Sequence, residues 1–288
     1  MFSIARRISD IIQSAESKNI FDIHFDPMGT ECKIRFRQDG VLRTVDSFPI
    51  ALYPAVIARL KRGVPRFLVS AIPVFDCEKI ILTFQNSPKK SSLEDMGFRA
   101  EHMAGIRKML GNDGICIVSG PIGSGKSTTI DMISRILKKD FGGVTELAAN
   151  SNFRDVGNVQ TRGIVMHNVR SAEAIACVVH AGLSGHAIVV EMNQPIDVDQ
   201  HIRENIVSGS IYQKFIRTLC SDCKVRDTND TKFFMSRGCA SCNHSGYVGR
   251  MPILEMSDPH TPTMKEDALI RAHDGQTSLA EVLRVCYG

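Results

Sequence analysis

Nine consecutive residues near the middle of the chain have the composition of a phosphate-binding loop. The segment from Gly120 to Thr128 reads GPIGSGKST and matches the pattern G-x-x-x-x-G-K-[ST] in full. Glycines let the backbone N–H groups of such a loop approach phosphates, because a Cβ would block the approach or forbid the φ angles. Lys126 is expected to reach the β- and γ-phosphates, and Ser127 follows where a Mg²⁺-binding hydroxyl is needed. The predicted nucleotide-contacting residues are Gly120, Pro121, Ile122, Gly123, Ser124, Gly125, Lys126, Ser127 and Thr128.

The residues on either side of this segment supply the strand and the helix that a phosphate loop requires. Ile115–Val118 is a short apolar run that suits a buried parallel strand. After the loop, Ile130, Ile133 and Leu137 repeat at helical spacing, and the N-terminus of such a helix adds partial positive charge at the phosphates. A glycine-rich turn with a chance lysine is the weaker explanation in this context. We therefore predict a nucleotide site with ATP and Mg²⁺ as its ligands.

Four cysteines in two C-x-x-C pairs form a second candidate site. Cys220 and Cys223 make the first pair, Cys239 and Cys242 make the second, and fifteen residues separate the pairs. Two residues between ligands let both sulfurs face one ion, so four thiolates at this spacing can close a tetrahedral Zn²⁺ site. Because four cysteines leave no open position for water, the predicted zinc is structural, and His244 is predicted to be a surface histidine. The alternative is four unrelated buried or reactive cysteines.

Composition limits the classes of protein that remain. With 288 residues and 43% hydrophobic content, the chain is long enough for two domains with their own cores. The formal net charge of +4 is small for this length and argues for neither a nucleic-acid partner nor an acidic ligand. No apolar run approaches the roughly 18 residues of a membrane span, and charge interrupts the N-terminal segment where a signal peptide needs its apolar core. We therefore expect a cytoplasmic protein, in which paired cysteines favour a metal over a disulfide.

The first part of the chain combines helical periodicity with alternating strands. The elements expected there are helices at Ser3–Gln13 and Ala51–Leu60 and strands at Cys32–Arg37, Val41–Val45 and Lys79–Phe84. This pattern is typical of a small α+β domain with antiparallel pairing, which we place at residues 1–92. The polar segment Asn86–Gly97, which carries Pro88, is the best linker candidate.

The second part, residues 93–288, alternates short apolar runs with helical segments. Beyond the loop helix, Gly163–Met166 and Ala187–Val190 are predicted strands, and Ala172–Ala181 between them is a predicted helix. Strand and helix in alternation favour a P-loop NTPase domain of RecA-like type with a mainly parallel sheet. The expected fold is therefore α/β, preceded by the small α+β domain and carrying a tetracysteine zinc subdomain at residues 218–247.

Several segments, in order along almost the whole chain, resemble the ATPases that drive type II secretion and type IV pilus assembly. Besides the phosphate loop and the cysteine pairs, they are DIHFDP at Asp22–Pro27, IRFRQDGVLR at Ile34–Arg43, AIPVFDCEKIIL at Ala71–Leu82, LEDMGF at Leu93–Phe98, AGLSGH at Ala181–His186 and GYVGRMPILE at Gly246–Glu255. The resemblance implies a PAS-like first domain and a homohexameric ring at the cytoplasmic face of the inner membrane. It further implies an inner-membrane platform protein and cytoplasmic components as partners, and ATP hydrolysis that drives pilin or pseudopilin assembly. The tetracysteine site is similar to that of assembly motors.

The segment that should carry the catalytic carboxylate departs from the family pattern. In the family a strand ends in glycine and glutamate followed by I-R-D, and the corresponding piece here is MHNVRS at Met166–Ser171, with Asn168 in the glutamate's position. An amide can hold a water molecule but cannot accept its proton, so turnover should suffer. The family's later histidine falls on Asn193, and His167 is predicted to be a loop histidine.

Two other acids are candidates for the missing function. Glu146 lies near the start of a trimmed acidic segment, Thr145–Gly163, and Glu191 directly follows an apolar strand, the generic form of a Walker B acid. The predicted catalytic residues are therefore Lys126, Glu146 and Glu191. The segment Lys61–Ser70 lacks the arginines that, by the resemblance, reach the nucleotide from the first domain.

Three functions are compatible with these motifs. The first is an ATP-hydrolysing assembly motor, and the second is a nucleotide-binding but catalytically weak or inactive ring subunit with a structural or regulatory role. The third is a nucleic-acid translocase with a zinc knuckle. The absence of Trp, the presence of only four Tyr and the small net charge disfavour the third, because a translocase needs a basic stripe and stacking aromatics.

Overall fold

The computed structural model comprises two compact units, residues 1–89 and 90–288. It describes residues 4–18, 20, 22–38, 41–74, 77–84, 92–111, 113–147, 155–156, 158–169, 171–193, 206–228 and 230–287. Among these residues, no helix is long and apolar enough to cross a membrane.

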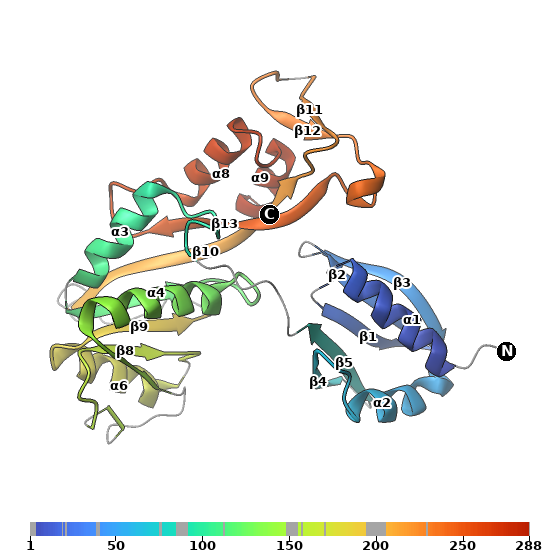
Figure 1. Cartoon of the computed structure of the whole chain (residues 1–288), viewed down its shortest axis with the longest axis horizontal. Coiled ribbons are helices and arrows are strands. Elements are labelled where there is room, and N and C mark those ends of the chain that lie inside the picture. Colours follow the sequence, from blue (N-terminus) through green and yellow to red (C-terminus); the bar gives the residue numbers. More distant parts are fainter. Residues whose placement is uncertain are drawn as a thin grey trace. The chain divides into compact units, whose positions relative to one another are not determined.

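The first unit is an antiparallel five-stranded sheet with two helices (Figure 1). The strands β1 (Asp22–Met28), β2 (Glu31–Gln38), β3 (Val41–Pro49), β4 (Phe67–Val74) and β5 (Cys77–Phe84) lie in the order β3-β2-β1-β5-β4, with α1 (Ile4–Ser17) before them and α2 (Tyr53–Lys61) after β3. Alternation along β1 places Ile23 and Phe25 in the core with Ile8 of α1 and Leu60 of α2. The two helices therefore pack as one layer on the apolar side of the sheet, and the core of this unit lies between the two layers.

The second unit is built on a six-stranded sheet. The strands β6 (Gly114–Ser119), β7 (Val144–Leu147), β8 (Gly163–Met166), β9 (Ala187–Met192), β10 (Val207–Leu219) and β13 (Tyr247–Met256) lie in the order β13-β10-β6-β9-β8-β7. All neighbours pair in parallel except β10 and β13, which are antiparallel. The predicted α/β fold with a mainly parallel sheet is confirmed.

Helices cover both faces of this sheet (Figure 1). They are α3 (Ala100–Gly111), α4 (Lys126–Phe141), α6 (Ala172–Leu183), α8 (Met264–His273) and α9 (Leu279–Cys286). One core contains Ile130 of α4 with Val118 of β6, and the opposite core contains Cys177 of α6 with Ile117 of β6. Because β6 is buried on both faces, its sequence is a continuous apolar run instead of an alternating one.

Local signals set the ends of the helices around the site. Helix α4 begins after Gly125 and ends before Gly142, both in the left-handed region. Helix α6 begins after Ser171, whose hydroxyl accepts a hydrogen bond from the backbone N–H of Ala174. These ends fix where the loop before α4 and the turn before α6 leave the sheet.

The end of the predicted linker Asn86–Gly97 belongs to the second unit. Leu93 and Met96 are buried in the core that also contains Ile106 of α3. The linker prediction is therefore wrong for residues 92–97, because two apolar side chains in this polar segment pack under α3. Residues 86–91 lie outside the described residues.

A small cysteine-bearing lobe interrupts the sequence between β10 and β13 (Figure 1). It contains β11 (Lys224–Arg226) and β12 (Phe234–Ser236), which pair in antiparallel fashion, and the single turn η2 (Ala240–Cys242). Such a short two-stranded pair is marginal by itself and needs another source of stability.

Candidate nucleotide-binding site and tetracysteine cluster

The phosphate loop lies at the carboxyl end of β6, where the chain enters α4. Its backbone packs directly on β10: a Cβ at Gly120, which has φ +146°, would collide with the carbonyl oxygen of Gln213. A Cβ at Gly125, which has φ +88°, would lie 2.5 Å from Cζ of Phe215. Both positions therefore require glycine for the backbone conformation and for the close approach of β10.

A buried glutamine on β10 holds the loop in place. Gln213 has no exposed surface, and its Nε2 donates a hydrogen bond to the carbonyl oxygen of Ser124 at 2.6 Å. Its Oε1 accepts a hydrogen bond from Oγ1 of Thr129 in α4 at 2.8 Å. The two bonds tie the loop and the first turns of α4 to the sheet. Sequence reasoning missed this residue, and the only signal was a glutamine two residues after the apolar Ile211 in the alternating segment that forms β10.

Lys126 lies over the loop with its side chain almost fully buried. Its Nζ donates to the carbonyl oxygens of Gly120 at 2.9 Å and Pro121 at 3.0 Å. Oγ of Ser124 is buried and has no hydrogen-bond partner among the described residues. An ammonium group, an unpaired hydroxyl and the N-terminus of α4 thus converge on one small region, which is a donor set suited to phosphate oxygens.

Glu191 is the acid that the structure brings to the loop. It lies near the end of β9, the strand beside β6, and pairs in register with Val118 just before the loop. Oγ of Ser127 donates to its Oε1 at 2.9 Å, and Nδ1 of His167 lies 3.3 Å from its Oε2. The carboxylate is only 13% exposed. Ser127 and Glu191 therefore present a hydroxyl and a carboxylate oxygen side by side, the ligand types that Mg²⁺ prefers.

The structure does not bring Glu146 to the loop. Glu146 lies on the edge strand β7, where it accepts hydrogen bonds from Nζ of Lys138 at 3.0 Å and Oγ of Ser134 at 3.4 Å. Lys138 comes eleven residues after Ser127 in α4, which corresponds to about 16 Å along a helix. The hydrogen bond from Lys138 lowers the pKa of Glu146 below its ordinary value. Glu146 is thus half-exposed and ion-paired at a distance from the phosphate loop.

Asn168, in the position of the family's glutamate, is exposed in the turn after β8 and has φ +58°. The turn closes on the neighbouring strand, because the N–H of Val169 donates to the carbonyl oxygen of Glu191 at 2.9 Å. The side chain that meets Glu191 from this turn is that of His167.

The four cysteine sulfurs of the small lobe form a compact cluster. The ligand atoms of Cys220, Cys223, Cys239 and Cys242 all lie within 4.8 Å of one another. The closest sulfur pairs are 3.7 to 3.8 Å apart. A tetrahedron with metal–sulfur bonds of about 2.3 Å has edges of about 3.8 Å, so the cluster could hold one tetrahedral ion.

Backbone N–H groups also point at the sulfur of Cys242. The N–H groups of Cys239 and Gly246 both donate to it at 3.2 Å. Burial raises the pKa of Cys242, but these hydrogen bonds and the neighbouring thiols outweigh that effect and lower the pKa to about 6. A thiol that ionises this readily is a good metal ligand, because the thiolate is the form that binds.

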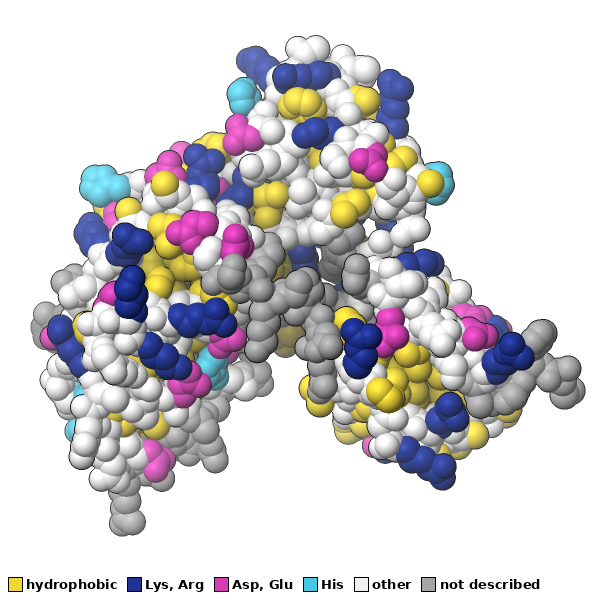
Figure 2. All heavy atoms as spheres, viewed as in Figure 1, with side chains coloured by type: hydrophobic (Ala, Val, Ile, Leu, Met, Phe, Trp, Pro, Cys, Tyr) yellow, Lys and Arg dark blue, Asp and Glu magenta, His cyan; other side chains and the backbone are white. Residues whose placement is uncertain are grey.

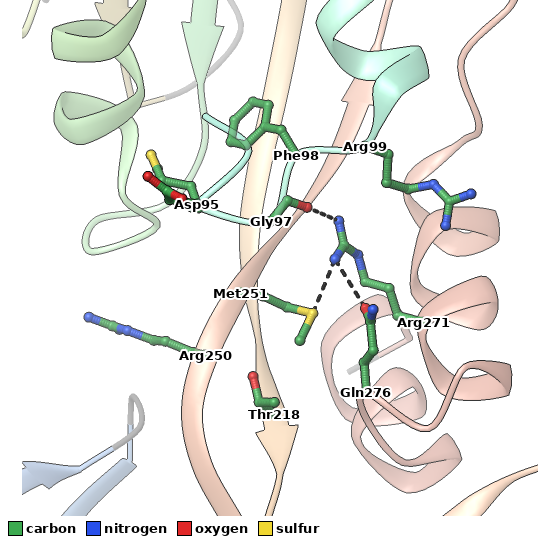
Figure 3. A pocket seen from close by; sticks show the side chains of 10 residues that line it. Asp95, Gly97, Phe98, Arg99, Thr218, Arg250, Met251, Arg271 and Gln276 are labelled. Atoms are coloured by element: carbon green, nitrogen blue, oxygen red, sulfur yellow. Dashed lines mark hydrogen bonds between the residues drawn. The ribbon is translucent and has the colours of Figure 1, made fainter. Parts of the chain in front are cut away.

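A separate cavity of about 450 Å³ lies between the start of the second unit and the strands β10 and β13 (Figure 3). Arg271 shapes it by donating to the carbonyl oxygen of Gly97 at 2.7 Å. Arg250 lines the cavity and places its guanidinium 4.5 Å from the ring centroid of Phe215, the residue that packs on Gly125. The cavity is therefore linked to the phosphate loop by two successive contacts, from Arg250 to Phe215 and from Phe215 to Gly125.

A parallel sheet with a glycine-rich loop between β6 and α4 defines a P-loop NTPase. The family model described as Type II/IV secretion system protein matches residues 2–63, 58–146 and 162–285. The chain therefore belongs to this family.

Two named relatives are identical to this chain at about a quarter of the aligned positions. The type II secretion system ATPase E of Vibrio cholerae is 25% identical over 377 residues, which cover 98% of this chain and 75% of that protein. The type IV pilus assembly ATPase TfpB of Acinetobacter baylyi is 25% identical, covering 98% of this chain and 65% of that protein. This chain is thus shorter than either relative.

Solved structures share the fold. The ATPase DotB of Legionella pneumophila superimposes with a TM-score of 0.62 at 15% identity, covering 98% of this chain and 95% of that one. The pilus retraction motor PilT with bound ADP gives a TM-score of 0.55 at 13% identity, covering 96% and 95% of the two chains. The α/β fold predicted from the sequence agrees with both.

Proposed function

We propose that this protein is an ATP-binding motor subunit of a type II secretion or type IV pilus assembly system, and that its ATP hydrolysis drives pilin or pseudopilin assembly. The observation that carries the proposal is the complete phosphate loop with Glu191 hydrogen-bonded to Ser127, in a chain of this family. Related proteins named as type II secretion and type IV pilus ATPases support the choice of apparatus.

Different residues of the site would bind the phosphates, hold the magnesium ion and orient the attacking water. The loop N–H groups and the N-terminus of α4 would hold the phosphates, and Lys126 would exchange its present carbonyl partners for β- and γ-phosphate oxygens. Ser127 and Glu191 would hold the magnesium ion, which neutralises charge on the phosphates when it is bound. Glu191 is also the carboxylate that we propose to orient an attacking water, because it contacts Ser127 directly, whereas Glu146 is hydrogen-bonded to Lys138 and Ser134 of α4.

The cavity beside Phe215 is the proposed place for the base and sugar of the nucleotide. Arg250 lines the cavity and contacts Phe215, which in turn packs on Gly125 of the loop. The planar guanidinium of Arg250 could stack on the base of the nucleotide. Its volume of about 450 Å³ falls within the range of ordinary ligand pockets.

The four cysteines of the small lobe are the proposed site of a structural zinc ion. The sulfur–sulfur distances of 3.7 to 3.8 Å and the N–H groups aimed at Cys242 support it. The ion would complete its shell with sulfur and would stabilise the lobe between β10 and β13.

We place the protein in a homohexameric ring at the cytoplasmic face of the inner membrane, with an inner-membrane platform protein and cytoplasmic components as partners. The family membership supports this assembly. Nucleic acid is not among the proposed partners. On the face shown in Figure 2, Lys and Arg side chains of the described residues are interspersed with Asp and Glu side chains over the second unit.

One assay tests the motor function. Purified protein should release phosphate from Mg²⁺–ATP at least about tenfold faster than its Lys126→Ala variant, because this lysine is placed to stabilise the transferred phosphate. Equal rates would overturn the motor and leave the nucleotide-binding, catalytically inactive ring subunit in its place. Stimulation of phosphate release by single-stranded DNA would favour the translocase.

A further inference from the structure

We infer that His167 is a positioning residue for ATP hydrolysis, which holds Glu191 of β9 in the orientation that faces Ser127. This inference rests on the proposed ATPase function and concerns how its carboxylate is held. The sequence pattern predicted a plain loop histidine at this place, and the structure puts its imidazole against the acid of the site.

The parallel register of β8 and β9 brings the two residues together. Met166, the last residue of β8, pairs with Val190, which lies two residues before the end of β9. His167, directly after β8, therefore lies at the level of Glu191, which is still within β9. Nδ1 of His167 lies 3.3 Å from Oε2 of Glu191, while Oε1 accepts the hydroxyl of Ser127 at 2.9 Å. Each carboxylate oxygen thus has its own partner, one in the loop helix and one in the turn after β8.

The same turn also holds the backbone of Glu191. The N–H of Val169 donates to the carbonyl oxygen of Glu191 at 2.9 Å, and Val169 is buried in the core beneath. Asn168 between them adopts φ +58°, which lets the chain reverse over the end of β9. Because the turn contacts Glu191 through both side chain and backbone, the imidazole is fixed relative to the carboxylate.

A glutamate needs such a partner to act from this position. Its side chain has three rotatable bonds, and a single hydrogen bond to Ser127 leaves the carboxylate free to turn about that contact. The side chain of Glu191 is 13% exposed and that of His167 is 34% exposed, so the acid is the less accessible of the two. Residues that orient a metal-binding carboxylate typically contribute about 10- to 100-fold to metal affinity or activity.

The decisive variants are His167→Ala and His167→Asn, with the exposed histidine variant His260→Ala as the matched control. We expect His167→Ala to lower kcat about 10- to 100-fold while KM for ATP changes less than about threefold, because loop and lysine are untouched. His167→Asn should recover most of the rate, because its amide can place an N–H donor near the position of Nδ1. His260→Ala should match wild type, because His260 is exposed and lies between β13 and α8, outside the turn that contacts Glu191.

A second readout needs no turnover. In nucleotide-free protein, the ¹⁵N resonances of the His167 imidazole should shift when Glu191→Gln removes the charged partner, and those of the exposed His260 should not. In the presence of ADP, the affinity for Mn²⁺ measured by electron paramagnetic resonance should fall about 10-fold in His167→Ala.

The outcomes separate this inference from the proposed function. A His167→Ala protein as fast as wild type, or one in which His167→Asn restores nothing, overturns the positioning role and leaves the ATPase assignment intact. A wild-type protein no faster than Lys126→Ala overturns both.

Discussion

The tetracysteine cluster takes all four sulfurs from one segment between β10 and β13, whereas the nucleotide site draws on four neighbouring strands. Cys220 to Cys242 are close in sequence, so their spacing alone specifies a knuckle. The phosphate loop follows β6, but Glu191 comes from β9, His167 from the turn after β8 and Gln213 from β10. The comparison shows that a contiguous motif can predict which ligand binds. The residues that complete the binding site can nevertheless come from distant parts of the chain.

The largest expected effect concerns the cysteine lobe. Cys242→Ser should abolish binding of the proposed zinc ion and unfold residues 218–247, because zinc binding contributes about 10–16 kcal/mol to comparable small domains. ATP affinity should stay within about threefold of wild type, since none of the loop contacts involves the lobe. Elemental analysis, limited proteolysis and calorimetry would measure these three quantities.

The matched control for this variant is Cys77→Ser, which changes an exposed cysteine of the first unit. It should retain both the ion and the protease resistance. A joint loss of zinc and of ATP binding in Cys242→Ser would break the comparison, because the two sites would then depend on each other.

The second prediction contrasts the two acids that the sequence left open. Glu191→Gln should lower the rate of phosphate release about 100-fold or more, because it removes the carboxylate beside Ser127. Glu146→Gln should leave the rate of phosphate release within about twofold of wild type. The carboxylate of Glu146, on the edge strand β7, forms an ion pair with Lys138 of α4. Steady-state kinetics on both variants would decide. The opposite ranking would transfer the water-orienting role to β7.

The third prediction sharpens the dependence of the loop on β10. Gln213→Ala should lower the free energy of unfolding by about 1–3 kcal/mol, because Thr129 and the carbonyl of Ser124 lose their buried partner. ATP affinity should fall at the same time. Urea denaturation and calorimetry would measure the two effects, with the exposed Gln160→Ala as control. A loop that binds ATP normally without Gln213 would show that its conformation is set locally.

The smallest expected effect tests the cavity. Arg250→Ala should weaken ATP binding about two- to fivefold, since the proposed stacking of a partly exposed guanidinium on the base would contribute about 0.5–1 kcal/mol. Binding of inorganic tripolyphosphate should be unchanged, because it fills only the phosphate loop. If ATP and tripolyphosphate both bound more weakly by the same factor, Arg250 would act by supporting Phe215 and the loop and not by contacting the base.

Much of the fold was accessible from the sequence because its signals are local. The apolar run of β6, the helical spacing of α4 and the strands β8 and β9 were predicted with nearly the observed limits. The long strands β10 and β13 were not predicted, since their burial depends on partners far away in sequence. The linker was extended too far for the same reason, as Leu93 and Met96 become core residues only under α3.

The sequence by itself determined the two ligand chemistries, because glycines, a lysine and a hydroxyl at fixed spacing, and cysteines two residues apart, act through neighbouring backbone. Only the tertiary structure decided which acid lies beside the loop. Glu191 and Glu146 are the same residue type, each in or next to an apolar segment, so the sequence alone does not separate them. The sheet order places β9 beside β6 and β7 at the edge of the sheet. Strand order depends on pairing between segments distant in sequence, and it alone places His167 against Glu191.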